Sequence, residues 1–413
     1  MAAISKLSSS VERQLRSSLS VASFSHCTEE LVFNSLEANA GWIKVRLNFP
    51  VCAVEVLDDG QGIPMEDLAA VATCTPPKQL VSRCYAQWGR SLCNIAGVAE
   101  RVTVVSRGRL STTSYQKTVH KGVDLGISPM EGGRISASTL VAVEGMFYNL
   151  PVRQKTLDCQ KETASLISFL EHMSLIYPDV FFALENTATQ RVVLQLPRCR
   201  SMTAALSRLA SVSLTRSSLA PIEVDHSCFS IKGYVAKQMI PSKNHQYIFI
   251  NRRPVMRGSL HETVNKSIAQ RCNQLIAQHV QRYTILFLNI SCDKSEYSLY
   301  LDALHTEVEF KKQQEISSAF DKVGKCVAQH LCCGANTVHH PEPPPPATAQ
   351  PASLESSRPT PRSKADTLSV KRIHNSTTVK RSDRSDLGFP PDTPPMTGET
   401  SNPTYLLLHL CNV

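Results

Sequence analysis

Segments with the pattern of strands and segments with the pattern of helices alternate over residues 1–335, and this order limits the folds open to the chain. Alternating apolar residues or a high β-branched content predict strands at residues 52–63, 139–147, 192–197, 229–236, 246–255 and 284–290. Apolar residues three or four positions apart predict long helices at residues 161–178, 261–280 and 313–331. We therefore expect an α/β (α+β) fold of layered helices and sheets, because elements mixed in this order do not fit a helical bundle or a barrel.

The composition changes sharply after residue 335. Residues 336–413 hold 13 of the 24 prolines and only two aromatic residues, Phe389 and Tyr405. Such a segment cannot bury enough apolar surface to fold, so we expect a disordered Pro/Ser-rich tail. The predicted hairpin that ends near residue 197 closes a first domain. We therefore predict domains at residues 1–205 and 206–335.

The charge and hydropathy of the chain restrict its environment. The net charge of +9 at pH 7 is a modest excess for 413 residues and indicates an acidic partner such as nucleic acid. No segment approaches the roughly 18 consecutive apolar residues that a membrane helix needs. The first residues are too polar and too charged for a secretory signal. We expect a protein inside the cell, with no membrane partner.

The segment EELVFNSLEANA, residues 29–40, has the apolar content of a buried helix but carries acids and an amide. Glu30, Asn34 and Glu37 share one face of a helix, beside apolar residues on both sides. An unpaired carboxylate at the edge of a core usually has a partner, a metal or a chemical role. The alternative, which this segment alone favours, is an amphipathic helix whose polar edge faces water.

The segment VLDDGQGI, residues 56–63, predicts a strand that delivers two acids into a turn. Gly60 and Gly62 would let the backbone approach a ligand closely, and a carboxylate there could accept a hydrogen bond from a base. An ordinary Asp-Gly hairpin turn is the alternative. The turn alone does not decide between the two.

In this order and spacing, the two segments resemble the ATP-binding superfamily of gyrases, heat-shock chaperones, histidine kinases and MutL mismatch-repair proteins. The resemblance implies a Mg²⁺-ATP-binding α/β sandwich. It makes Glu30 the general base that orients water on the γ-phosphate, Asn34 the Mg²⁺ ligand, and Asp58 the group that binds the adenine amino group. It also implies cofactor-binding positions at Gly60, Gly62, Lys78, Gly89 and Thr139. Phosphoryl transfer needs little more than a positioned water and a hard cation with oxygen ligands.

Two later segments look like signatures of the MutL homologues within this superfamily. They are MFYNLPVRQK, residues 146–155, and QYIFINRRPV, residues 246–255. The second would be a strand of a transducer domain with the ribosomal-protein-like fold. Its basic cluster of Arg252, Arg253 and Arg257 is a candidate DNA contact or, at similar odds, a solvated edge. Other segments look most like the eukaryotic MutL homologue 3 branch.

The phosphate lid departs from the family pattern. Residues 74–96 place Lys78 and Gly89 on the family's lysine and last glycine, but Pro76 and Pro77 replace Thr-Ser. Ala86 replaces the family's first glycine, and Arg90 stands where the family has Glu. Two prolines remove two N–H donors from a loop that must hold phosphates. Ser138 also replaces a glycine before Thr139, and His305 stands where a lysine should reach the γ-phosphate.

The resemblance implies a MutL-type ATPase acting as a nucleotide-gated DNA clamp in mismatch repair and meiotic recombination. Its implied cofactors are ATP and Mg²⁺. DNA and a MutL homologue 1 subunit are the implied partners, with a nuclear location. No endonuclease motif follows in this sequence, so we expect no nuclease domain in this chain.

Several alternatives stay open. The chain could be a non-catalytic DNA- or partner-binding scaffold with a decayed ATP site, or a truncated splice product that lacks the endonuclease domain. The altered lid could also mark a mistaken exon boundary. A histidine kinase is a distant alternative, because it would need a phosphoacceptor helix before the ATP domain, and only about 25 residues precede it.

Overall fold

The computed structural model describes residues 8–73, 86–130, 138–211, 213–226, 228–256, 258–276, 283–301 and 306–334. The chain divides into two compact units, Met1–Thr337 and Val338–Val413, and every described residue belongs to the first. The predicted tail at residues 336–413 therefore lies outside the described residues. None of the described helices is long and apolar enough to cross a membrane.

The N-terminal part of the described chain builds a mixed eight-stranded sheet in the order β5-β4-β3-β6-β2-β1-β7-β8. Neighbouring strands run antiparallel, except that β1 and β7 are parallel. The strands are β1 (Trp42–Asn48), β2 (Ala53–Asp58), β3 (Ala99–Ser106), β4 (Tyr115–His120), β5 (Val123–Pro129), β6 (Thr139–Met146), β7 (Phe181–Asn186) and β8 (Arg191–Leu196).

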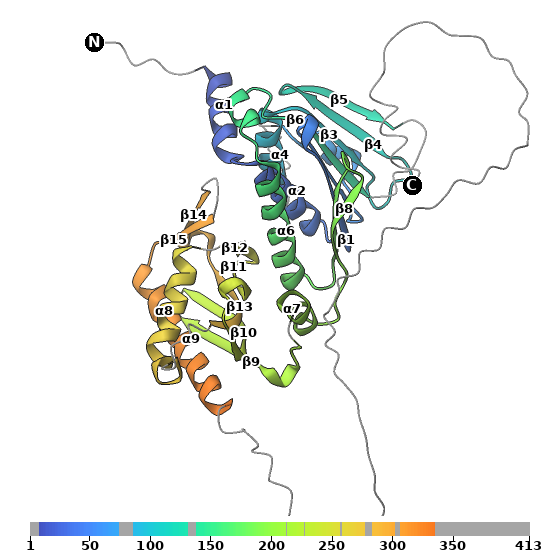
Figure 1. Cartoon of the computed structure of the whole chain (residues 1–413). Coiled ribbons are helices and arrows are strands. Elements are labelled where there is room, and N and C mark those ends of the chain that lie inside the picture. The colour runs from blue at the N-terminus through green and yellow to red at the C-terminus, as the bar shows by residue number, and fades with distance from the viewer. Residues whose placement is uncertain are drawn as a thin grey trace, which may run out of the picture. The chain divides into compact units, whose positions relative to one another are not determined.

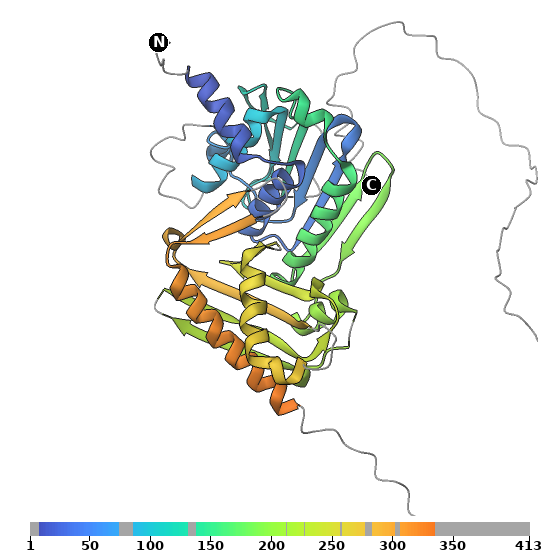
Figure 2. The ribbon, with the colours of Figure 1, turned by 60° about the vertical axis from the view of Figure 1, so that its left-hand side comes forward.

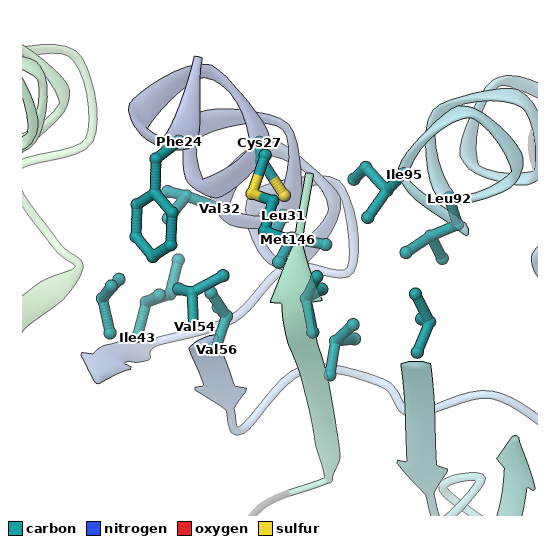
Figure 3. Packing of buried hydrophobic residues seen from close by; sticks show 14 of the residues in the cluster. Phe24, Cys27, Leu31, Val32, Ile43, Val54, Val56, Leu92, Ile95 and Met146 are labelled. Carbon is teal, nitrogen blue, oxygen red and sulfur yellow. The ribbon is translucent and has the colours of Figure 1, made fainter. Parts of the chain in front are cut away.

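Helices α2, α4 and α6 pack against this sheet and bury its main core (Figure 1). Along β1, every second residue is buried, which is the pattern of a strand with one face on a core. Figure 3 shows α2 meeting the strands through Phe24, Cys27, Leu31, Val32, Ile43, Val54 and Val56. The helices of this part are α1 (Ser9–Ser20), α2 (Phe24–Glu37), α3 (Met65–Leu68), α4 (Ala86–Val98), α5 (Pro151–Lys155), α6 (Cys159–Ile176) and α7 (Met202–Ala210), with a 3₁₀ turn η1 (Phe49–Val51).

A second, five-stranded sheet has the order β12-β11-β13-β10-β9. Helices α8 and α9 lie side by side against one of its faces (Figure 2). A separate hairpin of β14 and β15 contacts β12 through β15. The elements are β9 (Leu219–His226), β10 (Phe229–Ile240), β11 (Gln246–Ile250), β12 (Arg253–Val255), α8 (Ser259–Ile276), β13 (Tyr283–Cys292), β14 (Tyr297–Leu301), β15 (Thr306–Phe310) and α9 (Gln313–Gly334), with 3₁₀ turns η2 (Arg216–Ser218), η3 (Lys243–His245) and η4 (Lys294–Glu296).

The opposite face of the second sheet packs on α6 and α7. Leu175 at the end of α6 and Leu206 of α7 form one buried cluster with Tyr247 and Phe249 of β11. The ring of His172 on α6 meets the Tyr247 ring edge to face, with centroids 5.0 Å apart. The predicted domain boundary after residue 205 falls inside α7.

The α/β fold class is confirmed, and the predicted long helices form at α6, α8 and α9. The prediction of one strand at residues 246–255 is wrong, because this segment is the hairpin β11–β12. Its two loop residues, Asn251 and Arg252, have φ of 49° and 68°. Positive φ at both loop residues is the geometry of the tight turn that suits the twist of a hairpin. Neither residue is glycine, so the sequence carried no strong turn signal.

Candidate functional site

Helix α2 supplies the polar stripe seen in the sequence. It begins at Ser23, whose hydroxyl accepts a hydrogen bond from the backbone N–H of His26 at 3.0 Å. Glu30 and Asn34 are half-buried, whereas Glu37 is exposed. The side-chain Nδ2 of Asn34 is buried and has no hydrogen-bond partner. The stripe therefore does not simply face water, and it leaves an unsatisfied amide beside the core.

The two adjacent acids at the end of β2 have different surroundings. Asp58 is buried, and its Oδ2 and Oδ1 accept hydrogen bonds from Ser35 Oγ at 2.8 Å and from the Gly60 N–H at 2.9 Å. Burial raises the pKa of Asp58 to about 6, although both hydrogen bonds oppose the shift. Asp59 instead accepts from the backbone N–H groups of Gly41 and Trp42 at 2.6 and 2.7 Å. Asp59 thus fixes the connection from α2 to β1, and Asp58 is directed at the helix.

The glycine turn sits where only glycine fits. A Cβ at Gly60 would lie 2.8 Å from the Cβ of Ala38 at the end of α2. Gly62 has φ +69°, and a Cβ there would lie 1.9 Å from the carbonyl oxygen of Arg107. The turn can therefore lie directly against the end of α2 and the loop after β3.

Thr139 lies next to Asp58 in the sheet. The two residues are cross-strand partners on β6 and β2, and Thr139 is buried. Its hydroxyl lies 3.0 Å from Ser106 Oγ, which in turn accepts a hydrogen bond from the backbone N–H of Ile63 at 2.8 Å. The sheet register thus brings Asp58, Thr139 and the glycine turn together.

Glu30 is held on both carboxylate oxygens. Its Oε2 accepts from Ser91 Oγ on α4 at 3.0 Å, and its Oε1 accepts from Arg253 Nη1 at 2.9 Å. The neighbouring Glu29 is half-buried. Burial, followed by the charges of Glu30 and Glu162, raises the pKa of Glu29 to about 7, and the charge of Arg253 opposes this rise.

The predicted basic cluster lies against α2 and α6. The Arg253 guanidinium stacks on the Phe33 ring, 4.2 Å from its centroid, besides pairing with Glu30. The Arg252 guanidinium lies 4.5 Å from the centroid of Tyr177. Arg257 lies outside the described residues.

The lid positions are only partly described. Gly89 belongs to helix α4. Lys78 and His305 lie outside the described residues. The structure therefore places Asp58 and Thr139 side by side on β2 and β6 and binds Asp58 to Ser35 of α2, the helix that carries Glu30 and Asn34 one turn apart.

Sequence reasoning missed two residues of this region. Ser35 binds Asp58 and directly follows Asn34 on the same helix. Its place on the buried face of that helix could have been inferred from the helical spacing of the apolar residues. Ser91 binds Glu30 across 61 residues of sequence and carried no signal of its own. The MutL-like segment at residues 146–155 has a packing role, because Arg153 Nη1 donates to the carbonyl oxygens of Ser18 and Val21 at 2.9 and 3.0 Å.

Two family models match the chain. Residues 22–125 match the model described as histidine kinase-, DNA gyrase B-, and HSP90-like ATPase. Residues 212–326 match the model described as DNA mismatch repair protein, C-terminal domain. The first match runs from α2 to the start of β5, and the second runs from before β9 into α9 and so includes the whole second sheet.

Curated relatives and solved structures agree with these matches. The chain is 29% identical over 328 residues to the human DNA mismatch repair protein Mlh3, an alignment that covers 74% of this chain and 22% of the relative. It is 25% identical over 299 residues to the DNA mismatch repair protein MutL of Thermodesulfovibrio yellowstonii, covering 70% and 52%. The chain thus spans about a fifth of the first relative and half of the second. A crystal structure of the N-terminal domain of a DNA repair protein has the same fold, with a TM-score of 0.60 and 18% identity, covering 80% of this chain and 99% of that one.

Proposed function

Because the chain belongs to the MutL family of DNA mismatch repair proteins, we propose that its ATPase-like domain binds Mg²⁺-ATP and hydrolyses it. The observation that carries the proposal is that helix α2, which holds Glu30 and Asn34, is bound through Ser35 to Asp58, the cross-strand partner of Thr139. These groups supply a base and an amide for the cation, which serve phosphoryl transfer, and acceptors for a nucleobase, which serve nucleotide binding.

Asp58 is suited to hold the adenine. Ser35 and the Gly60 N–H each donate to one carboxylate oxygen, which fixes the plane of the carboxylate. Each oxygen keeps a further lone pair that can accept from an amino group. We assign Gly60 and Gly62 the role of letting the turn approach the nucleotide.

The Asn34 amide fits a cation ligand. Its buried nitrogen has no partner, and rotating the amide by half a turn exchanges nitrogen for oxygen at that position. Oxygen is the ligand atom that Mg²⁺ prefers, and the cation would neutralise charge on the transferred phosphoryl group. Glu30, one helical turn away on the same face, is positioned to accept a proton from the attacking water.

We extend the proposal to the second sheet as a transducer domain that converts nucleotide state into DNA enclosure, in mismatch repair and meiotic recombination. The net charge of +9 supports a polyanionic partner. A MutL homologue 1 subunit and a nuclear location belong to the same proposal. Contacts to phosphates carry no sequence information, so DNA affinity should fall steeply with salt.

Substitutions of Asn34 and Glu30 test the ATPase directly. In the full chain, Asn34→Ala should abolish saturable ATP binding at millimolar ATP, because the cation loses a ligand. Glu30→Ala should leave ATP binding intact and lower turnover by about 10²–10⁴-fold, the usual contribution of a general base. ATP titration by calorimetry and a phosphate-release assay measure the two effects, and the exposed Glu12→Ala on α1 serves as the control.

The competing function is a scaffold whose ATP site has decayed. Pro76, Pro77 and Ala86 in the sequence of the lid favour it. The wild-type titration separates the two functions, because a scaffold gives no saturable ATP signal. Loss of binding in Glu30→Ala would instead mean that Glu30 is not the base.

A further inference from the structure

Arg253 links the second sheet to the proposed base. Its Nη1 donates to Glu30 Oε1 at 2.9 Å, and its guanidinium plane stacks 4.2 Å from the centroid of Phe33. Glu30 and Phe33 are three residues apart on α2 and therefore share a face. One planar side chain thus engages two positions of the same helix, in a pair that is only partly exposed, with 36% of the Arg253 side chain and 23% of the Glu30 side chain accessible.

The hairpin β11–β12 holds Arg253 in this place. Arg253 follows the left-handed Asn251 and Arg252 and pairs with Ile250 across the turn. The Asn251 side chain anchors the turn, since its Nδ2 donates to the Cys292 carbonyl oxygen at 2.9 Å and its Oδ1 accepts from the Cys292 N–H at 3.1 Å. Phe249, fully buried on β11, packs in the cluster that includes Leu175 of α6. The position of Arg253 is therefore set by the packing of the whole sheet.

The groups around Glu30 are mostly acidic. Glu29 adjoins it on α2, and Glu162 of α6 acts on Glu29. Burial lowers the pKa of His26 and leaves this imidazole neutral at pH 7, while burial keeps the Cys27 thiol protonated by raising its pKa. Within the described part of the chain, Arg253 offsets this acidic group, and it comes from a different sheet.

We propose that Arg253 is a positioning residue for Glu30, which fixes the carboxylate and makes ATP turnover depend on the hairpin β11–β12. The inference rests on the proposed ATPase function. With Ser91 on one oxygen and Arg253 on the other, the carboxylate cannot rotate without losing a hydrogen bond. Each oxygen still has a lone pair for the attacking water.

Arginine suits this role better than lysine. Its planar guanidinium can stack on Phe33 and donate to Glu30 at the same time, whereas an ammonium group is a point charge that cannot stack. The assignment differs from both alternatives that the sequence left open for Arg253, a DNA contact and a solvated edge, because its guanidinium is engaged with Glu30 and Phe33. DNA contact is an outcome that the test must distinguish.

The test compares Arg253→Met, Arg253→Lys and, as the control on the same sheet, Lys232→Met in the full chain. Arg253→Met should lower kcat by roughly tenfold to a hundredfold, which is part of the contribution of a general base, while the ATP Kd stays within about threefold. Arg253→Lys keeps the charge but not the stacking on Phe33, so its kcat should lie between those of Arg253→Met and the wild type. Lys232→Met should leave kcat unchanged, since Lys232 is an exposed cation on β10 that pairs with Glu223. DNA affinity at two salt concentrations is measured for every variant.

The outcomes are separable. Wild-type kcat in Arg253→Met would overturn the proposal, and lower DNA affinity with intact turnover would assign Arg253 to DNA instead. A weakened ATP Kd with unchanged kcat would also contradict it. If the wild type itself hydrolyses no ATP, the proposed function fails. A double-mutant cycle of Arg253→Met and Glu30→Gln in urea unfolding then measures whether Arg253 and Glu30 are coupled, independently of ATP turnover. Additive effects in that cycle would rule out the coupling.

Discussion

Two adjacent aspartates, Asp58 and Asp59, have different roles that the sequence alone does not distinguish. Asp58 and Asp59 are adjacent and chemically identical, yet Asp59 binds two backbone N–H groups between α2 and β1, whereas Asp58 is buried against Ser35. The difference follows from position, since Asp58 ends β2 with its side chain against α2, whereas Asp59 follows the strand in the turn. Burial of Asp58 raises its pKa to about 6, so its ionised form destabilises the fold.

Asp58→Asn should therefore affect stability and ATP binding in opposite directions. Because the pKa of this carboxyl group is raised in the folded state, the folded protein loses stability as the pH increases from about 4 to 6. Above pH 6 the neutral amide avoids a penalty of up to about 3 kcal/mol, less the value of the altered hydrogen bonds. The variant should thus match or exceed the stability of the wild type at pH 8 and gain less at pH 4, while its affinity for ATP falls.

Urea unfolding of both proteins at pH 4 and pH 8, with an ATP titration at pH 8, measures these effects. The wild type should also bind ATP less well as the pH falls below about 6, because the acceptor becomes protonated. A larger loss of stability in the variant at pH 8 than at pH 4 would contradict the burial argument.

At the scale of elements, the turn between β2 and α3 depends on glycine, and most strongly on Gly62. Gly62→Ala should lower the free energy of unfolding by more than about 2 kcal/mol, because it combines a left-handed φ of +69° with a Cβ 1.9 Å from the Arg107 carbonyl oxygen. Gly122→Ala is the matched control. Its φ is +78°, but nothing lies within 4 Å of the added Cβ, so it should cost only about 1–2 kcal/mol. Thermal unfolding measures the loss of stability in each variant. Equal losses would show that the clash of the added Cβ with the Arg107 carbonyl oxygen contributes nothing.

The sequence predicts elements well where their patterns are local. The helices at α6, α8 and α9 and the strand at β2 have clear periods, and the paired motifs identified Glu30, Asn34 and Asp58 as candidates before any contact was known. The hairpin β11–β12 was missed, because Asn251 and Arg252 adopt positive φ without a glycine to announce it. The contact between Arg253 and Glu30 spans 223 residues, so no local pattern contains it.

At the scale of the described chain, three buried clusters hold the layers together. One lies under α2, α4 and α6, one under α8 and α9, and the third joins α6 and α7 to the other face of the second sheet. Only the third of these clusters contains residues of β11 that face α6 and α7, and it therefore fixes the strand that leads to Arg253. Packing there should therefore influence the proposed ATP chemistry, whereas packing under α9 should influence stability alone.

Phe249→Ala and Phe320→Ala test this division of roles. Both rings are fully buried, Phe249 in the third cluster, where its centroid lies 5.3 Å from that of Phe287, and Phe320 under α9 in the second. Each truncation should cost about 3–5 kcal/mol, so stability alone cannot separate the variants. At a temperature where circular dichroism shows both to be folded, Phe249→Ala should have a lower kcat than Phe320→Ala at the same ATP affinity. Equal kcat values in the two variants would mean that the third cluster holds the sheet without transmitting anything to Glu30.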